Sequence, residues 1–371
     1  MRNWLRRVDA IALLFFCFLL LTVHAQAQVN VTTQHYDNAR TGQNTQETTL
    51  KPSNVNQNGF GKLFSVPVDG YMYAQPLYLS NVSIAAGTHN VVFAATEHDS
   101  VYAYDADDGT LYWHVSFVNP AAGITSVAYT DVNCGDLRPE IGITGPPVID
   151  ASSGTIYVVA KTKENGSYRQ RLHALDVATG AERPGSPVVI AATVSGTGDG
   201  SSNGLLSFNA QLHMNRPGLL LHGGQVIIAW ASHFDVIPCL GCVMSYNAST
   251  LAQEAVFNTS PYSGLSGIWM SGGGLAGDSG LNTYFATGNG FYDGTASFGD
   301  SVLKLGPPAG VFPLADWFTP NNQSTLSQFD IDLGSGGVVV LPDQPAGSPH
   351  QHLLAMSGKE GKLYLLDRDN M

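Results

Sequence analysis

The sequence contains few charged residues, and few of those are basic. Only 12% of its 371 residues are Asp, Glu, Lys or Arg, against about a quarter in an average soluble domain. Lys and Arg number 17 against 29 Asp and Glu, which gives a formal net charge of −12. Phosphate backbones and anionic lipids repel such a chain. We therefore expect neither nucleic acid nor an anionic membrane surface as a partner.

Cysteine is also scarce, and its spacing excludes the common zinc sites. Cys134, Cys239 and Cys242 follow the N-terminal region, and the chain has no second Cys-x-x-Cys motif. A structural zinc site would need four ligands at suitable spacing. Cys239 and Cys242 could close a small disulfide loop, or Cys134 could pair with either of them. The sequence leaves this pairing open.

Several catalytic patterns are missing as well. Residues 200–204 match the Gly-x-Ser-x-Gly pattern, but they lie in a stretch rich in Gly and Ser without the strand and helix that flank a nucleophile elbow. The glycine-rich residues 272–274 and 334–337 precede predicted strands rather than helices. Such glycines do not form a phosphate-binding loop, which opens a helix. Paired carboxylates for glycoside hydrolysis stay open, because their spacing is spatial.

The N-terminus has the pattern of a secretory signal peptide. Arg2, Arg6 and Arg7 precede an apolar run over residues 10–23, and Ala25-Gln26-Ala27 offers small residues for cleavage. This run is too short for a typical membrane span, and no other run approaches that length. We predict a signal peptide over residues 1–27 and one domain over 28–371, located outside the cell or in the periplasm at the cell envelope. Removing three arginines and one aspartate changes the charge from −12 to −14.

The remaining chain contains five copies of one unit. In each copy, a first apolar landmark is followed 29 or 30 residues later by a second. The first landmarks are Pro76, Pro147, Pro217, Leu275 and Val338, and the second are Asp105, Asp176, Asn247, Leu305 and Asp367. A fixed internal spacing with variable connections is typical of a repeated supersecondary unit.

Each unit predicts short β-strands. Segments rich in β-branched or aromatic residues lie at 91–95, 101–104, 156–160, 172–175, 226–230, 243–246, 283–286, 302–305 and 362–366. They are bounded by turn residues, and no sustained 3.6-residue period appears after the signal region. The fold class is therefore all-β, and four strands in each of several radial units describe a β-propeller of four-stranded antiparallel blades.

Two short motifs carry a family resemblance. Residues 102–105 with Gly109 and Trp113, and residues 173–176 with Thr179 and Gly180, resemble the tryptophan-docking repeat of quinoprotein propellers, the PQQ-like repeat. Residues 35–42, 95–100, 267–274, 358–361 and 367–371 resemble one branch of secreted bacterial PQQ-like propeller proteins. The resemblance extends from Gln34 to the last residue.

This resemblance implies a propeller of seven or eight blades, of which about five are present. The fifth unit stops at Met371, where its fourth strand should begin. We therefore expect a fragment truncated at the C-terminus, with an incomplete ring that exposes apolar surface. The alternative is a five-bladed ring that lacks one strand.

One end of such a propeller is polar. Strand direction alternates within a blade, so the loops before the first strand and between the second and third strands share one face. The B–C loops, between the second and third strands, are expected at 97–99, 161–166, 233–235, Asn289 and 359–360, and Arg216 precedes a first strand. The candidates for a ligand funnel on this face are Glu97, His98, Arg138, Glu140, His233, Asp235, Trp269 and Lys359. A cleft with convergent polar groups is the usual form of a binding site.

The resemblance raises the question of whether pyrroloquinoline quinone (PQQ) binds there. This planar tricarboxylate needs cationic partners, an aromatic floor and a calcium ion held by oxygens. Trp269 could be the floor, Arg138 or Lys359 a cation, and Glu140 or Asp235 a ligand or base. The adjacent cysteine pair common in quinoprotein alcohol dehydrogenases is missing.

The sequence therefore does not supply all the groups that the quinone needs, and we assign no catalytic residue, metal ligand or cofactor. The favoured hypothesis is a secreted, non-catalytic scaffold for binding or assembly at the cell envelope, with a protein or glycan partner on the loop face. The alternative is a PQQ- and calcium-dependent alcohol or sugar dehydrogenase.

Overall fold

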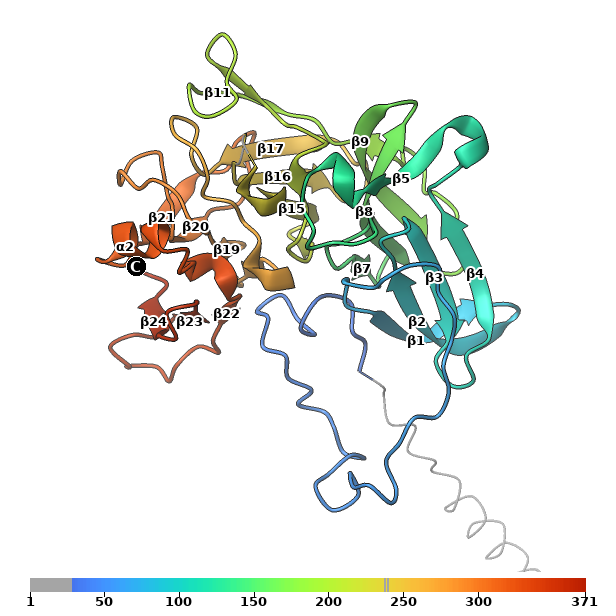
Figure 1. The fold of residues 1–371 in the computed structure, drawn as a ribbon. Coiled ribbons are helices and arrows are strands. Elements are labelled where there is room, and N and C mark those ends of the chain that lie inside the picture. Colours follow the sequence, from blue (N-terminus) through green and yellow to red (C-terminus); the bar gives the residue numbers. More distant parts are fainter. Residues whose placement is uncertain (1–28, 237, 239) are drawn as a thin grey trace, which may run out of the picture.

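The computed structural model describes residues 29–371 apart from 237 and 239. The predicted signal peptide and Cys239 lie outside the described residues. Antiparallel sheets follow one another along an arc from β1 to β24, and the N-terminal segment lies between the two ends of this arc (Figure 1). Helix is confined to short turns and to α2 (Gln323–Gln328) within the described part. The all-β prediction is confirmed. No helix in this part is long and apolar enough to cross a membrane.

The first and second sheets contain most of the long strands. The first has the order β1 (Leu77–Ile84), β2 (Gly87–Ala95), β3 (Ser100–Asp105) and β4 (Leu111–Ser116). The second has β7 (Val148–Asp150), β8 (Thr155–Glu164), β9 (Ser167–Asp176) and β10 (Val188–Val189), with β5 (Ile124–Ala128) and β6 (Glu140–Ile141) added beyond β8. Strands β5 and β6 belong to an insertion between repeats.

The other sheets continue the arc. The third contains β14 (Leu220–His222), β15 (Gln225–Ser232), β16 (Cys242–Asn247) and β17 (Gln253–Asn258), with β13 (His213–Met214) paired to β15. The fourth contains β18 (Ala276–Gly277), β19 (Thr283–Ala286), β20 (Val302–Leu305) and β21 (Leu314–Phe318), and the fifth contains β22 (Val338–Val340), β23 (Leu353–Ser357) and β24 (Leu363–Asp367). A separate hairpin of β11 (Thr193–Ser195) and β12 (Leu205–Ser207) precedes the third sheet.

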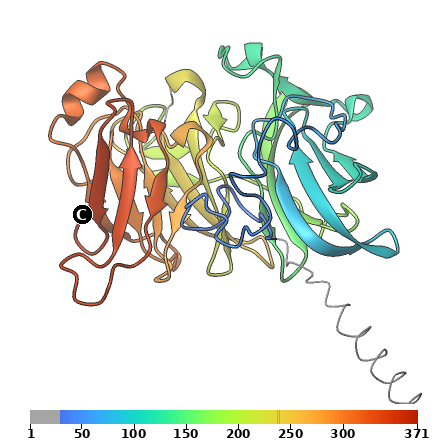
Figure 2. The same ribbon diagram turned by 90° about the horizontal axis from the view of Figure 1, so that it is seen from below.

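The repeat landmarks agree with these strands. Every second landmark is the last residue of the third strand of its sheet: Asp105, Asp176, Asn247, Leu305 and Asp367 end β3, β9, β16, β20 and β24. The innermost strands β7, β14, β18 and β22 contact one another in order, as radial blades require. Figure 2 shows the strands of successive blades side by side, each sheet presenting its face to the next. The predicted blade architecture is confirmed.

The hairpin after the third strand also joins neighbouring blades. Asp176 Oδ1 accepts hydrogen bonds from the amides of Ala178 and Thr179, and Gly180 has a φ of 70°. A Cβ atom at Gly180 would lie 2.8 Å from the ring of Trp113 in the first blade. Trp113 Nε1 donates to the carbonyl of Val177 at 3.0 Å. The indole of one blade therefore docks on the hairpin of the next, which only glycine permits.

Residues 31–40 run across the inner strands of all five blades. The backbones of Val31 and Tyr78 exchange two hydrogen bonds, and Ile149 N donates to Thr32 O. Further along, Gly277 N donates to Asn38 O and Val340 N to Ala39 O, while Asn38 Nδ2 donates to the Leu221 carbonyl. This N-terminal segment therefore stabilises the inner ends of the blades from one side.

Arg40 fixes that segment in place. The residue is 2% exposed, and its guanidinium donates to the carbonyls of Leu275 (2.7 Å), Gln34 (2.7 Å) and Leu219 (3.1 Å) and to Thr33 Oγ1 (2.5 Å). Burial lowers the pKa of Arg40 to about 9. The planar fork of donors satisfies acceptors in three directions at once, which a lysine could not do.

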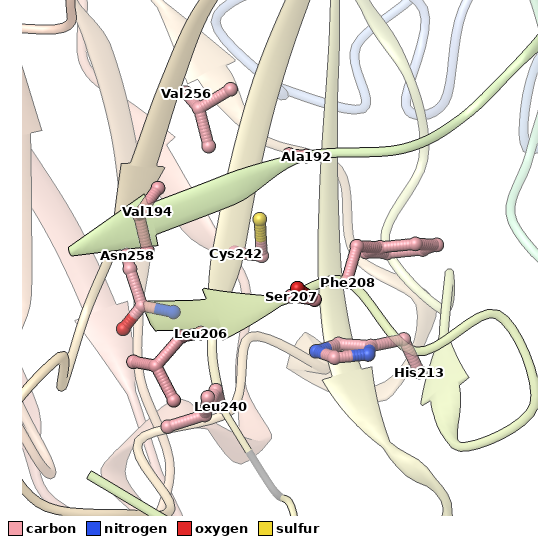
Figure 3. Close-up of a pocket in the computed structure, with 10 residues that line it drawn as sticks. All are labelled: Ala192, Val194, Leu206, Ser207, Phe208, His213, Leu240, Cys242, Val256 and Asn258. Atoms are coloured by element: carbon pink, nitrogen blue, oxygen red, sulfur yellow. The ribbon is translucent and has the colours of Figure 1, made fainter. Parts of the chain in front are cut away.

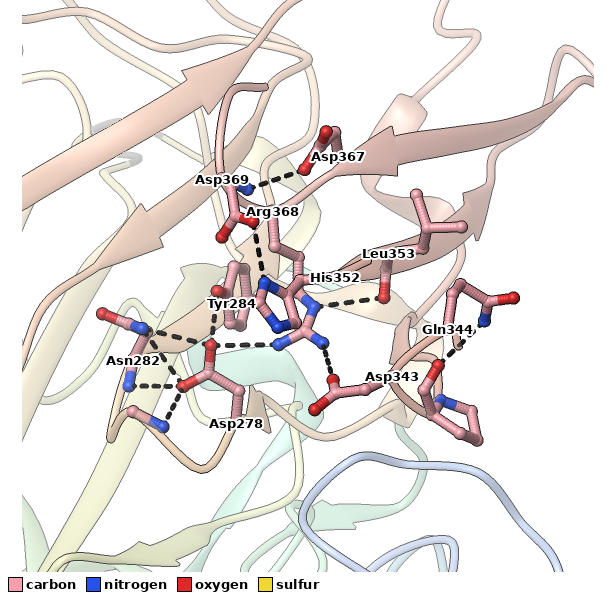
Figure 4. A network of polar contacts seen from close by, with 12 residues as sticks. Asp278, Asn282, Tyr284, Asp343, Gln344, His352, Leu353, Asp367, Arg368 and Asp369 are labelled. Atoms are coloured by element: carbon pink, nitrogen blue, oxygen red, sulfur yellow. Dashed lines mark hydrogen bonds and ion pairs between the residues drawn. The ribbon is translucent and has the colours of Figure 1, made fainter. Parts of the chain in front are cut away.

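A second buried arginine joins the fourth and fifth blades. Arg368, just after β24, pairs with Asp278 at 3.1 Å and with Asp343 at 3.0 Å, and its Nε donates to the Leu353 carbonyl (Figure 4). Asp278 also accepts from Tyr284 at 2.7 Å. On the outer side of the fifth sheet, Leu363 and Leu365 of β24 are 75% and 59% exposed. Truncation and an incomplete ring remain predictions.

Candidate functional site

The loop face contains an open cleft of about 370 Å³. Its lining residues are Asp136, Met214, Ala231, Ser232, Phe234, Asp235, Trp269, Asp330, Asp332 and Lys359. They come from the second to fifth blades: Asp235 ends the turn η3 (His233–Asp235) after β15, and Trp269 precedes the turn η4 (Met270–Gly272). Asp332 precedes η5 (Leu333–Ser335), and Lys359 follows β23. Three of the eight predicted funnel residues therefore meet here.

Lys359 lies within an acidic and aromatic corner of this cleft. Its ammonium is 2.5 Å from an oxygen of Asp332 and 3.1 Å from one of Asp330, and it donates to the Asp330 carbonyl at 3.1 Å. The ammonium also lies 5.7 Å from the centroid of the Trp269 ring. Burial opposes the charge, but the bonds to Asp332 and Asp330 outweigh it and raise the pKa of Lys359. The only ammonium among the described lining residues is thus already paired.

Two strained turns border the cleft: η3 contributes Phe234 and Asp235 to the lining, and η4 follows the lining residue Trp269. Phe234 and Asp235 have φ values of 52° and 50°, and Met270 and Ser271 have 40° and 48°. Non-glycine residues adopt this left-handed conformation at a cost of about 1 kcal/mol or more each, and such strain gathers at binding sites. The strained η3 turn leaves Phe234 73% exposed at the rim. The cleft therefore presents one rim ring, Phe234, and one wall ring, Trp269.

Beneath the cleft lies a buried ionisable cluster of Glu97, Asp99, Lys161 and His233. Lys161 Nζ donates to His233 Nε2 at 2.7 Å and to the carbonyls of Gln211 and His213. When Lys161 is charged, His233 accepts through Nε2 and carries its proton on Nδ1, which has no partner among the described residues. Burial and the neighbouring Lys161 lower the pKa of His233 to about 2, and burial lowers that of Lys161 to about 7.

The two carboxylates of this cluster connect blades. Glu97 Oε2 accepts from Gly142 N at 2.8 Å and from Thr144 Oγ1 at 3.0 Å, and Asp99 Oδ1 accepts from Lys161 N at 3.0 Å. Burial raises the pKa of Glu97 to about 7 and that of Asp99 well above its ordinary range. The sequence predicted polar loop residues at Glu97 and His233, whereas both are fully buried. Their contacts indicate a structural role at the interface between blades.

The other predicted residues lie apart from the cleft. His98 pairs with Glu140 at 2.8 Å, and Ser126 also donates to Glu140. Arg138 lies over the ring of Tyr129, 4.8 Å from its centroid. None of His98, Arg138 and Glu140 is among the described residues that line the cleft with Trp269.

One predicted loop is wrong. The expected B–C loop over residues 161–166 is mostly strand, because β8 extends to Glu164 and β9 begins at Ser167, which leaves only Asn165 and Gly166 as the turn. The polar residues continue the ladder because β5 pairs with this end of β8, with Ile124 opposite Glu164. Pairing with an inserted strand overrides the local polar pattern.

Three carboxylates of the cleft are not among the residues predicted from the sequence. Asp330 and Asp332 precede the first strand of the fifth blade, where the same loop rule that selected Trp269 could have found them. Asp136 lies in the long insertion after the turn η2 (Tyr129–Asp131), where no repeat pattern reaches it. Asp332 is 5% exposed, so its charge is deep in the cleft wall.

The lining does not fit pyrroloquinoline quinone. Four carboxylates and one paired ammonium give these residues a formal charge of −3, which repels a tricarboxylate. The described residues contain no group of three or more His, Cys, Asp or Glu side chains arranged to hold a metal ion. Trp269 could be a stacking floor, but Lys359 already contacts its ring.

Two cysteines, Cys134 and Cys242, are buried in the described part of the chain. Cys134 and Cys242 carry free thiols and are not paired with each other. The thiol of Cys242 points into a narrow crevice of about 20 Å³ between the β11–β12 hairpin and the third sheet, near His213 (Figure 3). Burial raises the pKa of Cys242 to about 12, so the thiol stays protonated. This crevice holds no more than a water molecule.

Comparison with solved structures supports the fold. The chain is similar to the quinohemoprotein alcohol dehydrogenase of Comamonas testosteroni (TM-score 0.62, 17% identity), covering 94% of this chain and 49% of that one. It is also similar to quinohemoprotein alcohol dehydrogenase ADHIIG of Pseudomonas putida HK5 (0.61, 17%, 92% and 46%) and to a europium-containing methanol dehydrogenase (0.55, 15%, 91% and 56%). The chain spans about half the length of these proteins, and likeness at this identity shows the fold alone. No family model and no curated protein matches the sequence.

Proposed function

We propose that this protein is a quinoprotein-like propeller that acts as a non-catalytic binding or assembly scaffold, exported to the cell envelope, with a protein or glycan partner on its loop face. The observation that carries the proposal is the charge of the cleft. Asp136, Asp235, Asp330 and Asp332 line it, and Lys359, the one ammonium among the described lining residues, pairs with two of them. The site that the fold places on the loop face thus suits a ligand other than an anionic quinone.

The buried groups support the same proposal. Lys161, Glu97 and His233 have strongly shifted pKa values, and shifted values often mark active sites. Here their partners are backbone groups, the Thr144 hydroxyl and one another, in the interior between blades. All three are buried, and none of them is among the described residues that line the cleft. They account for how the loop face is held rigid rather than for a reaction.

The competing hypothesis remains a quinone- and calcium-dependent dehydrogenase, which would rest on Trp269 and on the fold. The test titrates the purified chain with pyrroloquinoline quinone and Ca²⁺, and then assays dye-linked oxidation of alcohols and sugars. We expect neither saturable binding nor turnover. Binding that is lost in a Trp269→Leu variant, together with turnover, would overturn the scaffold proposal.

A further inference from the structure

The cleft has a chemical preference that its internal contacts reveal. The ammonium of Lys359 is surrounded by two carboxylates, one backbone carbonyl and an indole ring. Carboxylates combined with an aromatic face are the groups that recognise alkylammonium and guanidinium ions. The chain's own lysine therefore serves as an internal example of the ligand chemistry that this corner of the cleft accepts.

The rest of the cleft repeats these components. Asp235 and Asp136 line it from the η3 turn and the insertion of the second blade, and the ring of Phe234 is exposed at its rim. No Lys or Arg other than Lys359 occurs among the described lining residues. With a volume of about 370 Å³, the cleft has room for one or two extended side chains beside Lys359.

We propose that the cleft binds the basic side chains of a protein partner, with a lysine ammonium or arginine guanidinium held between the carboxylates and the rings of Trp269 and Phe234. This inference rests on the proposed binding function and narrows its partner to a basic peptide segment. The formal charge of −3 on the lining attracts such a segment and repels acidic ones. Lys359 competes with the incoming cation for Asp330 and Asp332, so it limits the affinity of the resting protein.

The experiment titrates the full chain with tetralysine, tetraglutamate and a neutral oligosaccharide, following heat and tryptophan fluorescence. We expect saturable binding of tetralysine alone, weakening steeply between about 0.1 M and about 1 M salt, where the screening length falls from about 10 Å to about 3 Å. Asp235→Asn should weaken tetralysine binding about five-fold, since it removes one of the carboxylates that attract the ligand.

Two further variants make the test specific. Lys359→Met keeps the length of the side chain and removes the competing ammonium, so it should strengthen tetralysine binding about ten-fold, close to the change that about 1.4 kcal/mol produces. Asp108→Asn, on the exposed hairpin of the first blade, is the matched control and should leave binding unchanged. Circular dichroism confirms that each variant is folded.

Different experimental results would overturn this inference and the proposed function. Saturable binding of the neutral oligosaccharide without tetralysine would overturn the cationic preference but leave a binding scaffold. Absence of tetralysine binding, or binding that Lys359→Met leaves unchanged or weakens, also overturns the inference. Quinone binding with turnover would instead overturn the scaffold itself.

Discussion

Replacing Arg40 with methionine should destabilise the whole arc of blades, because this residue fixes the N-terminal segment against their inner ends. The guanidinium makes four hydrogen bonds, to Leu275, Gln34, Leu219 and Thr33. At about 1.5 kcal/mol for each bond to a charged group, their loss removes about 6 kcal/mol. Burial of the charge, which lowers the pKa of Arg40 to about 9, already opposes folding and offsets part of that sum. We expect a net loss of about 3 kcal/mol in the free energy of unfolding.

Urea denaturation followed by tryptophan fluorescence measures this loss. Arg40→Lys should be intermediate, because it keeps the charge but not the fork of donors. Arg169→Met is the matched control, since Arg169 is exposed and donates only to the neighbouring Tyr168 carbonyl among the described contacts. The urea midpoint of Arg169→Met should equal that of the wild type.

Hydrogen exchange measures the effect of the same substitution at individual backbone amides. The amides of Ile149, Gly277 and Val340 donate to the N-terminal segment and should lose protection in Arg40→Met. The amide of Val158, in the middle of the β8–β9 ladder, should keep it. A variant whose free energy of unfolding is within about 1 kcal/mol of the wild type, with all three amides protected, would show that Arg40 does not fix the N-terminal segment.

Three more predictions concern other buried groups. Arg368→Met should cost about 3 kcal/mol in urea denaturation, at the lower end for a broken buried ion pair because Asp278 keeps other donors; a cost below about 1 kcal/mol would contradict this. Cys242, whose pKa is raised to about 12, should resist alkylation in the native state and react in urea, as mass spectrometry would show; rapid native labelling would count against its burial. Burial raises the pKa of Asp300 from 3.8 to about 7. Between these two pKa values the folded state binds more protons than the unfolded state. The free energy of unfolding should therefore fall as pH rises from about 4 to about 7. Asp300→Asn, which can still accept from Leu333 N, should flatten this dependence in denaturation series; an unchanged slope would exclude Asp300 as its source.

The blade architecture could be predicted because it depends on local patterns. Each second landmark ends a third strand, and Asp105, Asp176 and Asn247 also begin tight turns that the sequence itself encodes. Apolar alternation and turn residues act over a few positions, so a single copy is readable and five copies reinforce one another. The docking of Trp113 on Gly180 follows from the same repeat.

The site was less predictable because its charges meet across blades. Glu97 and Asp99 resemble solvent-facing loop residues, yet Asp99 has a φ of 53° and turns inward to bond the amide of Lys161, 62 positions away. Asp136 reaches the cleft from an insertion that the repeat does not describe. Pairing of this kind depends on how separate blades come together, which local sequence does not encode.

The preference of the cleft for cations over the anionic quinone can be measured in one comparison. Tryptophan fluorescence of the same protein sample is titrated in parallel with pyrroloquinoline quinone plus Ca²⁺ and with tetralysine. We expect a saturable change with tetralysine, lost in Trp269→Leu, and none with the quinone. Saturable binding of the quinone that depends on Trp269, with no response to tetralysine, would contradict this expectation.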